Sequence, residues 1–472
     1  MKYIPVIGLE IHAEMLTKTK VFCNCANEFG GKRNDRVCPV CSGMPGTLPV
    51  LNREAVTLAV RAGIALGCEI NEYSAFDRKN YFYPDLPKAY QITQFEHPIC
   101  ENGQILVRGK NMRINRIHIE EDAGKLTHDE AVGISMADYN RCGVPLIEIV
   151  TEPDLGTVEE VQAFVEQVAL RLKYAGVCDA RLEQGSLRVD VNISIMPENS
   201  EQLGTRTEIK NLNSVKAISK AIEYEILRQE RVLEEGRKVI QETRRFDEKE
   251  GKTIPLRSKE ESHDYRYFPE PDIVPVRISG EQIEEIRKSM PEGPEKRFER
   301  YTGTYHLPEE DARLIIGDKA FSDFYDETVK LFDGYKAVSN MMLGEFNRNI
   351  NETGKTAEEV IFTPQDLAEL VRMSEEGVVS KNAAKEIFKI MFETGEGPGK
   401  IAEDNGFIME NDVGRIEEIV DMVLAENKNV TESYKKGNQK MFGFLMGQVI
   451  RCVGNGANPK LVREILARKL DE

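Results

Sequence analysis

Charged side chains and one histidine alternate with apolar residues in three short runs of this sequence, and these residue types could hold a cation and a phosphate. Along residues 6–14 (VIGLEIHAE) a strand would place Glu10, His12 and Glu14 on one face and apolar side chains on the other. The same pattern also fits an ordinary antiparallel sheet with one solvated face. Residues 187–195 (LRVDVNISI) and 205–210 (TRTEIK) repeat it with the polar residues Arg188, Asp190, Asn192, Arg206, Glu208 and Lys210.

The second and third runs are separated by residues 197–204, which are rich in Pro, Asn, Ser and Gly. Such a loop between two alternating runs is typical of a hairpin. A hairpin would bring the two sets of charged side chains onto one face. We therefore expect a sheet with a polar face of mixed charge, able to serve as a reaction site.

Four of the nine cysteines lie close together in the sequence, as the pairs Cys23 and Cys25, and Cys38 and Cys41. Two such pairs joined by a loop can supply four sulfurs to a tetrahedral Zn²⁺. Because all four ligands would be protein sulfurs, such a site would be structural and not catalytic. The alternative is four reduced thiols in a loop; disulfides are disfavoured in the cytoplasm.

Length and composition indicate a chain of two or three domains. Of its 472 residues, 40% are hydrophobic and 30% are charged, with a net charge of −17. No apolar run approaches the roughly 20 residues of a membrane span, and the N-terminus does not resemble a secretion signal, so we expect a cytoplasmic protein without membrane contact. The sequence has no P-loop, and a bound nucleotide would need another kind of site.

The periodicity of the apolar residues changes near residues 291–294 (PEGP). Strand-like alternation mixes with a few helices before this point, including a helix over 157–174 that begins at Thr157. Helical periodicity prevails after it, with helix starts at Thr363 and Ser380. A second break at 395–399 (GEGPG) precedes a short C-terminal part.

The C-terminal part is basic although the chain as a whole is acidic. Residues 435–472 carry eight Lys or Arg and three acids, a net charge of +5. Clustered positive charge on an acidic protein favours a polyanionic partner, although a solvated helix face would look the same. The residues singled out as candidates are Lys435, Lys436, Lys440, Arg451, Lys460 and Arg463.

Seven longer strings complete the sequence evidence. They are FDRKNYFYPDLPKAYQITQ (76–94), IHIEEDAGK (117–125), DYNRCGVPLIEIVTEPD (138–154), GSLRVDVNIS (185–194), EIKNLNS (208–214), QETRRFDE (241–248) and HDYRYFPEPDIVP (263–275). In this order they closely resemble the B subunit of the tRNA-dependent Asp/Glu amidotransferase. The resemblance covers essentially the whole chain.

The resemblance implies an α+β protein with three parts. These are a catalytic cradle domain over 1–293, built on a mixed or antiparallel sheet with a zinc-binding insertion, an all-α helical domain over 294–404, and a small helical, tRNA-binding tail domain over 405–472. It also implies that the chain uses ATP and Mg²⁺ to phosphorylate the side-chain carboxylate of Glu-tRNA(Gln) or Asp-tRNA(Asn). Ammonia from a partner amidase, the A subunit, then gives the amide, and a small protein, the C subunit, completes the heterotrimer.

The resemblance also selects site residues. It assigns Mg²⁺ to Glu10, His12 and Glu121, with Glu148, Asp190 and Glu208 as further acidic candidates. Alternation alone does not choose between Glu120 and Glu121, because neighbours on a strand face opposite ways; the resemblance favours Glu121. The residues expected to bind phosphate or to guide ammonia are Lys79, Lys88, Arg188 and Lys210.

Two other functions remain open at this point. The chain could be a tRNA-binding scaffold without catalysis, whose partner does all the chemistry. It could also be a stand-alone ATP-dependent ligase that joins ammonia to a small acid. The acidic residues distinguish the first alternative from an enzyme, because a scaffold has no need of them; the second would work without tRNA.

Overall fold

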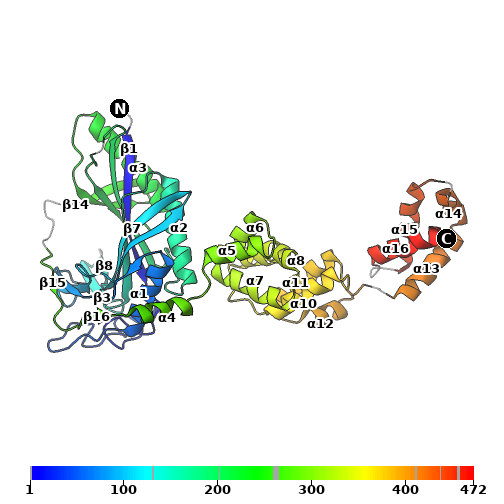
Figure 1. The fold of residues 1–472 in the computed structure, drawn as a ribbon, viewed down its shortest axis with the longest axis horizontal. Helices are drawn as coiled ribbons and strands as arrows, with labels where there is room; N and C mark the ends of the chain where they lie inside the picture. Colours follow the sequence, from blue (N-terminus) through cyan, green and yellow to red (C-terminus); the bar gives the residue numbers. More distant parts are fainter. Residues whose placement is uncertain are drawn as a thin grey trace. The chain divides into compact units, whose positions relative to one another are not determined.

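The computed structural model describes residues 3–129, 132–200, 202–258, 265–409, 412–435, 437–453 and 458–471. The chain divides into two units, Met1–Pro294 and Glu295–Glu472. The first unit is built on a sheet whose β1 (Tyr3–Glu14) lies near the centre (Figure 1). In order across this sheet the strands are β14 (Lys252–Ser258), β13 (Glu242–Asp247), β12 (Thr207–Lys210), β11 (Leu187–Pro197), β1, β10 (Pro145–Thr151), β7 (Lys110–Glu121), β6 (Cys100–Val107) and β2 (Glu69–Ile70).

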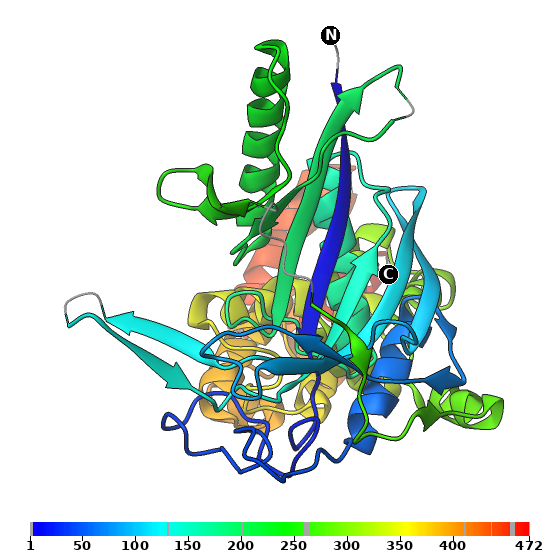
Figure 2. The ribbon, with the colours of Figure 1, turned by 90° about the vertical axis from the view of Figure 1, so that its left-hand side faces the viewer.

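Neighbouring strands of the large sheet are antiparallel, except for the parallel pair β12 and β13. β11 and β12 form the expected hairpin, with Val191 opposite Ile209. The remaining strands form three small sheets: β15 (Phe268–Pro269) with β4 (Asp77–Asn80) and β5 (Tyr90–Thr93), β16 (Val276–Arg277) with β3 (Tyr73–Ser74), and β8 (Lys125–Asp129) with β9 (Ile134–Asp138). Figure 2 shows the β8–β9 hairpin projecting from the body of the unit.

One face of the large sheet is apolar and packs against helices. Leu9 and Ile11 of β1 share a core with Phe164 and Val168 of α2. The expected helix is α2, and the Thr157 hydroxyl caps it by accepting from the Glu160 backbone N–H at 3.1 Å. Because side chains alternate along a strand, Glu10, His12 and Glu14 lie on the opposite face. The helices of this unit are α1 (Arg53–Ala65), α2 (Val158–Tyr174), α3 (Val215–Glu234) and α4 (Gly280–Ser289).

The second unit is helical, and its described residues form two hydrophobic cores. The larger core involves helices between α5 and α12, and the smaller one lies among α13 to α16. Thr363 and Ser380 cap α10 and α11, as the sequence predicts. The elements are α5 (Pro294–Gly303), α6 (Glu309–Ile316), α7 (Lys319–Leu331), α8 (Tyr335–Met341), a π-helix (Met342–Phe346), α9 (Asn347–Thr353), α10 (Pro364–Glu375), α11 (Lys381–Thr394), α12 (Pro398–Asp404), α13 (Val413–Glu426), α14 (Lys428–Lys435), α15 (Lys440–Val453) and α16 (Pro459–Asp471).

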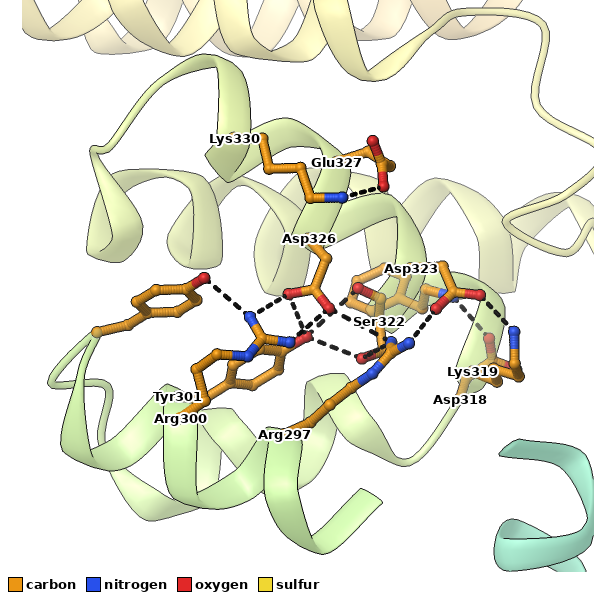
Figure 3. A network of polar contacts seen from close by, with 12 residues as sticks. Arg297, Arg300, Tyr301, Asp318, Lys319, Ser322, Asp323, Asp326, Glu327 and Lys330 are labelled. Carbon is orange, nitrogen blue, oxygen red and sulfur yellow. Dashed lines mark hydrogen bonds and ion pairs between the residues drawn. The ribbon is translucent and has the colours of Figure 1, made fainter. Parts of the chain in front are cut away.

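Helices α5 and α7 are joined by a buried polar network (Figure 3). Arg300 donates to both carboxylate oxygens of Asp326, at 2.9 and 2.8 Å, and the buried Tyr301 hydroxyl donates to the same carboxylate at 2.9 Å. Arg297 extends the network to Asp323 and Ser322. Buried charges are tolerated where their hydrogen bonds are satisfied, so this network fixes the two helices together.

A helix that crosses a membrane must be both long and predominantly apolar. Among the described residues, no helix combines the necessary length with sufficient apolar character.

Candidate active site and metal centres

A cluster of two histidines and two glutamates lies on the polar face at the middle of the large sheet. His12 of β1 is directly opposite Glu148 of β10, and Glu148 is directly opposite His118 of β7. The His12 Nε2 atom lies 3.5 Å from Glu148 Oε2 and 3.4 Å from Glu120 Oε1. The His118 Nε2 atom lies 3.1 Å from Glu148 Oε2. The sheet order therefore assembles this cluster from three neighbouring strands.

Burial and charge act in opposite directions on these groups. Burial alone would lower the pKa of His12, but the hydrogen bond and charge of Glu148, together with Glu120, raise it to about 9. For a carboxyl group burial acts the other way and would raise the pKa of Glu148, but the nearby His118 and His12 hold this pKa well below its ordinary value. The charged imidazolium and carboxylate groups thus stabilise each other. A cation bound in this cluster would take over the role of the protons on the two histidines.

A second cluster lies next to the first on the same face. Glu10 of β1 is opposite Asp190 of β11, and Glu208 comes from β12 on the far side of β11. Ligand atoms of these three carboxylates lie within 4.8 Å of one another, as do those of His12, Glu120 and Glu148. Burial, followed by repulsion from Glu148, raises the pKa of Glu10. Three converging carboxylates are a donor set suited to Mg²⁺.

Lys210 provides positive charge within the second cluster. Its Nζ atom lies 2.5 Å from Asp190 Oδ2 and 3.0 Å from Glu208 Oε1. Burial by itself would lower the pKa of Lys210, but these two carboxylates raise it. Asn192 completes the surroundings by donating to Glu10 Oε1 at 2.9 Å. A cation bound here would compete with the Lys210 ammonium for the same oxygens.

Glu121 does not join His12, and this corrects the predicted grouping of Glu10, His12 and Glu121. Consecutive residues of β7 face opposite sides, so Glu120 points to the histidines and Glu121 points away. The Glu121 Oε1 atom accepts from Lys88 Nζ at 2.6 Å and from the Ile92 backbone N–H at 2.9 Å. The pair lines a pocket of about 210 Å³, whose walls also include Cys23, Cys41 and Gly143.

The other two basic candidates occupy different surroundings. Lys79 of β4 lies with its Nζ atom 4.9 Å from the centre of the Tyr265 ring. Burial would lower the pKa of Lys79, but the charge of Glu120, followed by those of Tyr267 and Glu148, raises it. Arg188 is already paired, since its Nη2 atom lies 2.9 Å from Asp122 Oδ2.

A small pocket opens beside the second cluster. It has a volume of about 240 Å³, and its walls include Glu10, Asn192 and Arg206 with Gly8 and Gly204. Arg206 is exposed at its edge. The pocket thus presents the Arg206 cation and one carboxylate of the cluster, that of Glu10, to the same space.

The four cysteines of the predicted zinc site converge. All four sulfurs lie within 4.8 Å of one another, with Cys38 and Cys41 3.8 Å apart and Cys25 and Cys41 4.0 Å apart. A tetrahedral zinc with Zn–S bonds of about 2.3 Å requires sulfurs about 3.8 Å apart. The Cys38 backbone N–H donates to the Cys41 sulfur at 3.2 Å. The residues present therefore fit zinc.

Five of the six basic residues proposed for the tail are exposed on its helices. Lys435 ends α14, Lys440 and Arg451 lie on α15, and Lys460 and Arg463 lie on α16. In the described part of the tail, none of these five has a carboxylate partner, whereas Arg468 pairs with Glu417. Lys436 lies outside the described residues.

The sequence analysis did not predict His118 as a site residue, and it chose Glu121 in place of Glu120. The string IHIEE carried a signal for both, because alternation puts His118 and Glu120 on one face and Glu121 on the other. The sequence does not state that β7 lies two strands from β1, and this non-local order brings His118 and Glu120 to His12.

Comparison with protein families defines the class of this chain. The model of the GatB/GatE catalytic domain matches residues 5–284, which contain both clusters and the large sheet except the first two residues of β1. A second model, described as the GatB domain, matches residues 323–470 of the helical unit.

Individual relatives extend the match to the full chain. Proteins from Ruminiclostridium cellulolyticum and Thermoanaerobacter pseudethanolicus are both 52% identical over 476 residues, covering 100% of this chain and 98% and 100% of their own lengths. A protein from Thermodesulfovibrio yellowstonii is 47% identical over 476 residues, with both chains covered completely. All three are named as the B subunit of aspartyl/glutamyl-tRNA(Asn/Gln) amidotransferase. The chain belongs to the family of these B subunits.

Proposed function

We propose that this chain uses ATP to activate the side-chain carboxylate of Glu-tRNA(Gln), Asp-tRNA(Asn) or both, and that ammonia then converts the activated carboxylate to the amide. Membership of the family of B subunits supports this proposal. The observation that carries it is the pair of adjacent clusters on the polar face, which would provide cation ligands at a single reaction site.

Phosphorylation of a carboxylate depends on positioning and on neutralising oxygen charge. Mg²⁺, held by Glu10, Asp190 and Glu208 and by the His12 cluster, would supply that neutralisation when bound. Lys210 adds positive charge within the second cluster, and Lys79 would add positive charge that acts on Glu120 and Glu148. Arg206 and the pocket beside Glu10 would hold part of the nucleotide.

The ammonia step is proposed for the opposite side of β7. Lys88 and Glu121 form a close ion pair in a pocket, and Glu121 is too well occupied by Lys88 and Ile92 to serve the His12 cluster. This pair would guide ammonia towards the activated carboxylate. The ammonia itself would come from an amidase, the A subunit, with a small C subunit completing a heterotrimer in the cytoplasm.

The domains would divide the work. Residues 1–293 would carry the chemistry and a structural zinc on Cys23, Cys25, Cys38 and Cys41. Residues 294–404 would connect this part to residues 405–472, whose exposed lysines and arginines would contact tRNA phosphates. Recognition of the tRNA would then depend on shape and charge more than on bases.

The test separates the activation step from the ammonia step. The chain is combined with its amidase and its small third protein, and release of the ATP γ-phosphate is measured with and without misacylated Glu-tRNA(Gln) and Asp-tRNA(Asn). Glu148→Gln should lower tRNA-dependent release by about 100-fold or more, because it removes a charge from the cluster. Glu121→Gln is the matched control on the other face and should retain release while lowering amide formation.

The outcome also decides between an enzyme and a scaffold. Release that is indifferent to Glu148 in a folded, tRNA-binding variant would contradict the proposal and favour a scaffold. Release that needs no tRNA would instead indicate a ligase that acts on a small acid.

A further inference from the structure

A fully buried lysine lies directly beside the four cysteines. Lys20 has an exposed fraction of 0%, and its Nζ atom donates to the Arg36 carbonyl at 2.9 Å, to the Tyr139 carbonyl at 3.2 Å and to the Cys41 sulfur at 3.6 Å. An ammonium group has three N–H donors, and here each has one acceptor. Burying a charge of this kind is costly unless it is fully hydrogen-bonded and electrostatically matched.

The four cysteine sulfurs provide the negative charge that matches the buried Lys20 ammonium. A zinc ion bound by four thiolates leaves a net charge of −2, and removing that charge from water is unfavourable without a compensating cation. Two other cations lie nearby and are engaged elsewhere. Arg36 has its Nε atom 3.5 Å from Asp35 Oδ1 and its Nη1 atom 3.8 Å from Glu28 Oε2. Lys88, which shares a pocket wall with Cys23 and Cys41, donates to Glu121 Oε1 at 2.6 Å. Lys20 is therefore the cation that faces the cluster directly.

The two carbonyls that Lys20 binds belong to different segments. Arg36 lies in the loop between the two cysteine pairs, and Tyr139 follows β9 at the base of the β8–β9 hairpin. Further bonds join the same segments, since Asn140 accepts from the Arg36 backbone N–H at 3.0 Å and Asn34 accepts from the Tyr139 backbone N–H at 2.7 Å. Lys20 is thus the buried centre of a contact between the cysteine loop and the hairpin.

We propose that Lys20 is a positioning residue for the four-cysteine centre: its ammonium compensates the thiolate charge, and its two carbonyl bonds hold the centre against the base of the β8–β9 hairpin. This inference rests on the proposed zinc. Groups that orient metal ligands from outside the coordination sphere commonly change metal affinity by about 10- to 100-fold when they are removed. The hairpin would then depend on the metal for its orientation.

The first test measures the metal in the full-length chain. Lys20→Met removes the charge at similar length, Lys20→Gln keeps a donor without the charge, and Lys18→Met is the matched control at an exposed lysine of the same segment. Zinc content is measured by elemental analysis and zinc release by transfer to a coloured chelator. Both Lys20 variants should release zinc about 10-fold faster or more, whereas the control should match the wild type.

A spectroscopic readout separates positioning from loss of fold. Cobalt is substituted for zinc, and the thiolate-to-cobalt charge-transfer band is recorded. Losing the N–H···S hydrogen bond should shift this band of Lys20→Met to lower energy, because the sulfur lone pairs are no longer stabilised. A band and a release rate equal to those of the wild type would overturn the proposal for Lys20 while leaving the zinc site intact. A wild-type chain that takes up neither zinc nor cobalt would overturn the zinc site itself.

A second experiment uses the wild-type chain and remains decisive if both Lys20 variants fail to fold. Amide hydrogen exchange is followed before and after zinc removal by a chelator. Protection should fall at the Tyr139 amide, which donates to Asn34, and at the Arg36 amide, which donates to Asn140. Unchanged protection at both amides in zinc-free protein would contradict a metal-dependent contact with the hairpin.

Discussion

At the scale of single residues, the direction of one side chain decides which glutamate belongs to which step. Glu120 and Glu121 are neighbours in sequence, yet Glu120 faces His12 and Glu121 faces Lys88. The two carboxylates are both buried, with exposed fractions of 4% and 3%, so exposure does not distinguish them. Their partners do: two histidines for Glu120, and a lysine with a backbone N–H for Glu121.

A prediction for Glu120 follows from this arrangement. Glu120→Gln should lower tRNA-dependent release of the ATP γ-phosphate to the level of Glu148→Gln, because both carboxylates face His12. The effect expected is about 100-fold. Parallel assays of the two variants check this, with circular dichroism to verify folding. Activity of Glu120→Gln near that of the wild type would remove Glu120 from the site.

A pH prediction concerns Glu14, the third polar residue of the β1 row. Burial, followed by the charge of Asp122, raises the pKa of Glu14 to about 7. In the unfolded chain the ordinary pKa is 4.5, so between these values the native state holds a proton that the unfolded state has lost. The free energy of unfolding therefore falls as the pH rises through this window.

Replacing Glu14 by glutamine, which does not titrate, removes this fall in the free energy of unfolding at higher pH. Glu14→Gln should be more stable than the wild type at pH 8 by roughly 1 kcal/mol, after allowance for partial exposure, and should lose this advantage at pH 4. Urea unfolding at the two pH values measures the difference. Glu96→Gln, at an exposed position, is the control and should show no such dependence. An equal gain for Glu14→Gln at both pH values would contradict the pKa argument.

At the scale of elements, strict alternation was enough to predict β1 and the β11–β12 hairpin, including the polar face they share. The cysteine spacing was likewise enough to predict that four sulfurs meet. The positions of β10 and β7 were not predictable in this way, because strand order depends on contacts between residues far apart in the sequence. His12 and His118 come together because Glu148, which contacts both, lies on the strand between them, and no local pattern carries that information.

Helix pairing in the second unit offers an energetic prediction. Asp326 of α7 has an exposed fraction of 8% and receives hydrogen bonds from Arg300 and Tyr301 of α5 (Figure 3). Asp326→Ala would remove the carboxylate partner of the half-buried Arg300 guanidinium and of the fully buried Tyr301 hydroxyl, and the unfolding free energy should fall by about 3 kcal/mol. Thermal and urea unfolding of the full chain measure the change.

The neighbouring residue provides a control for this prediction. Glu327 also pairs with a basic residue, Lys330 at 2.6 Å, but both side chains are exposed. Glu327→Ala should cost no more than about 0.5 kcal/mol, because exposed ion pairs contribute little. Comparable losses for the two variants would show that burial is not what gives the network its strength.

At the scale of the whole molecule, the described residues form three hydrophobic cores, and charge is markedly separated along the chain. The net charge is −17, yet the segment 435–472 is positive, and its exposed cations lie on helices built around a small core of their own. This core holds α13 to α16 together through residues such as Leu445, Val449 and Leu466. Charge can therefore be changed on the outside of these helices without disturbing their packing.

The last prediction uses that independence to test tRNA binding. Each lysine or arginine that contacts a phosphate releases counterions, so its removal should lower the salt dependence of tRNA affinity by nearly one unit of log–log slope. Lys460→Gln combined with Arg463→Gln should thus weaken binding at low salt and lower the slope by nearly two. The control is Arg468→Gln, because Arg468 already pairs with Glu417 and has less charge to offer. Binding is measured by filter retention or fluorescence anisotropy between about 50 and 200 mM salt. If the double variant and the control change the slope equally, the positive charge of the tail acts only in bulk, and specific contacts by α16 are ruled out.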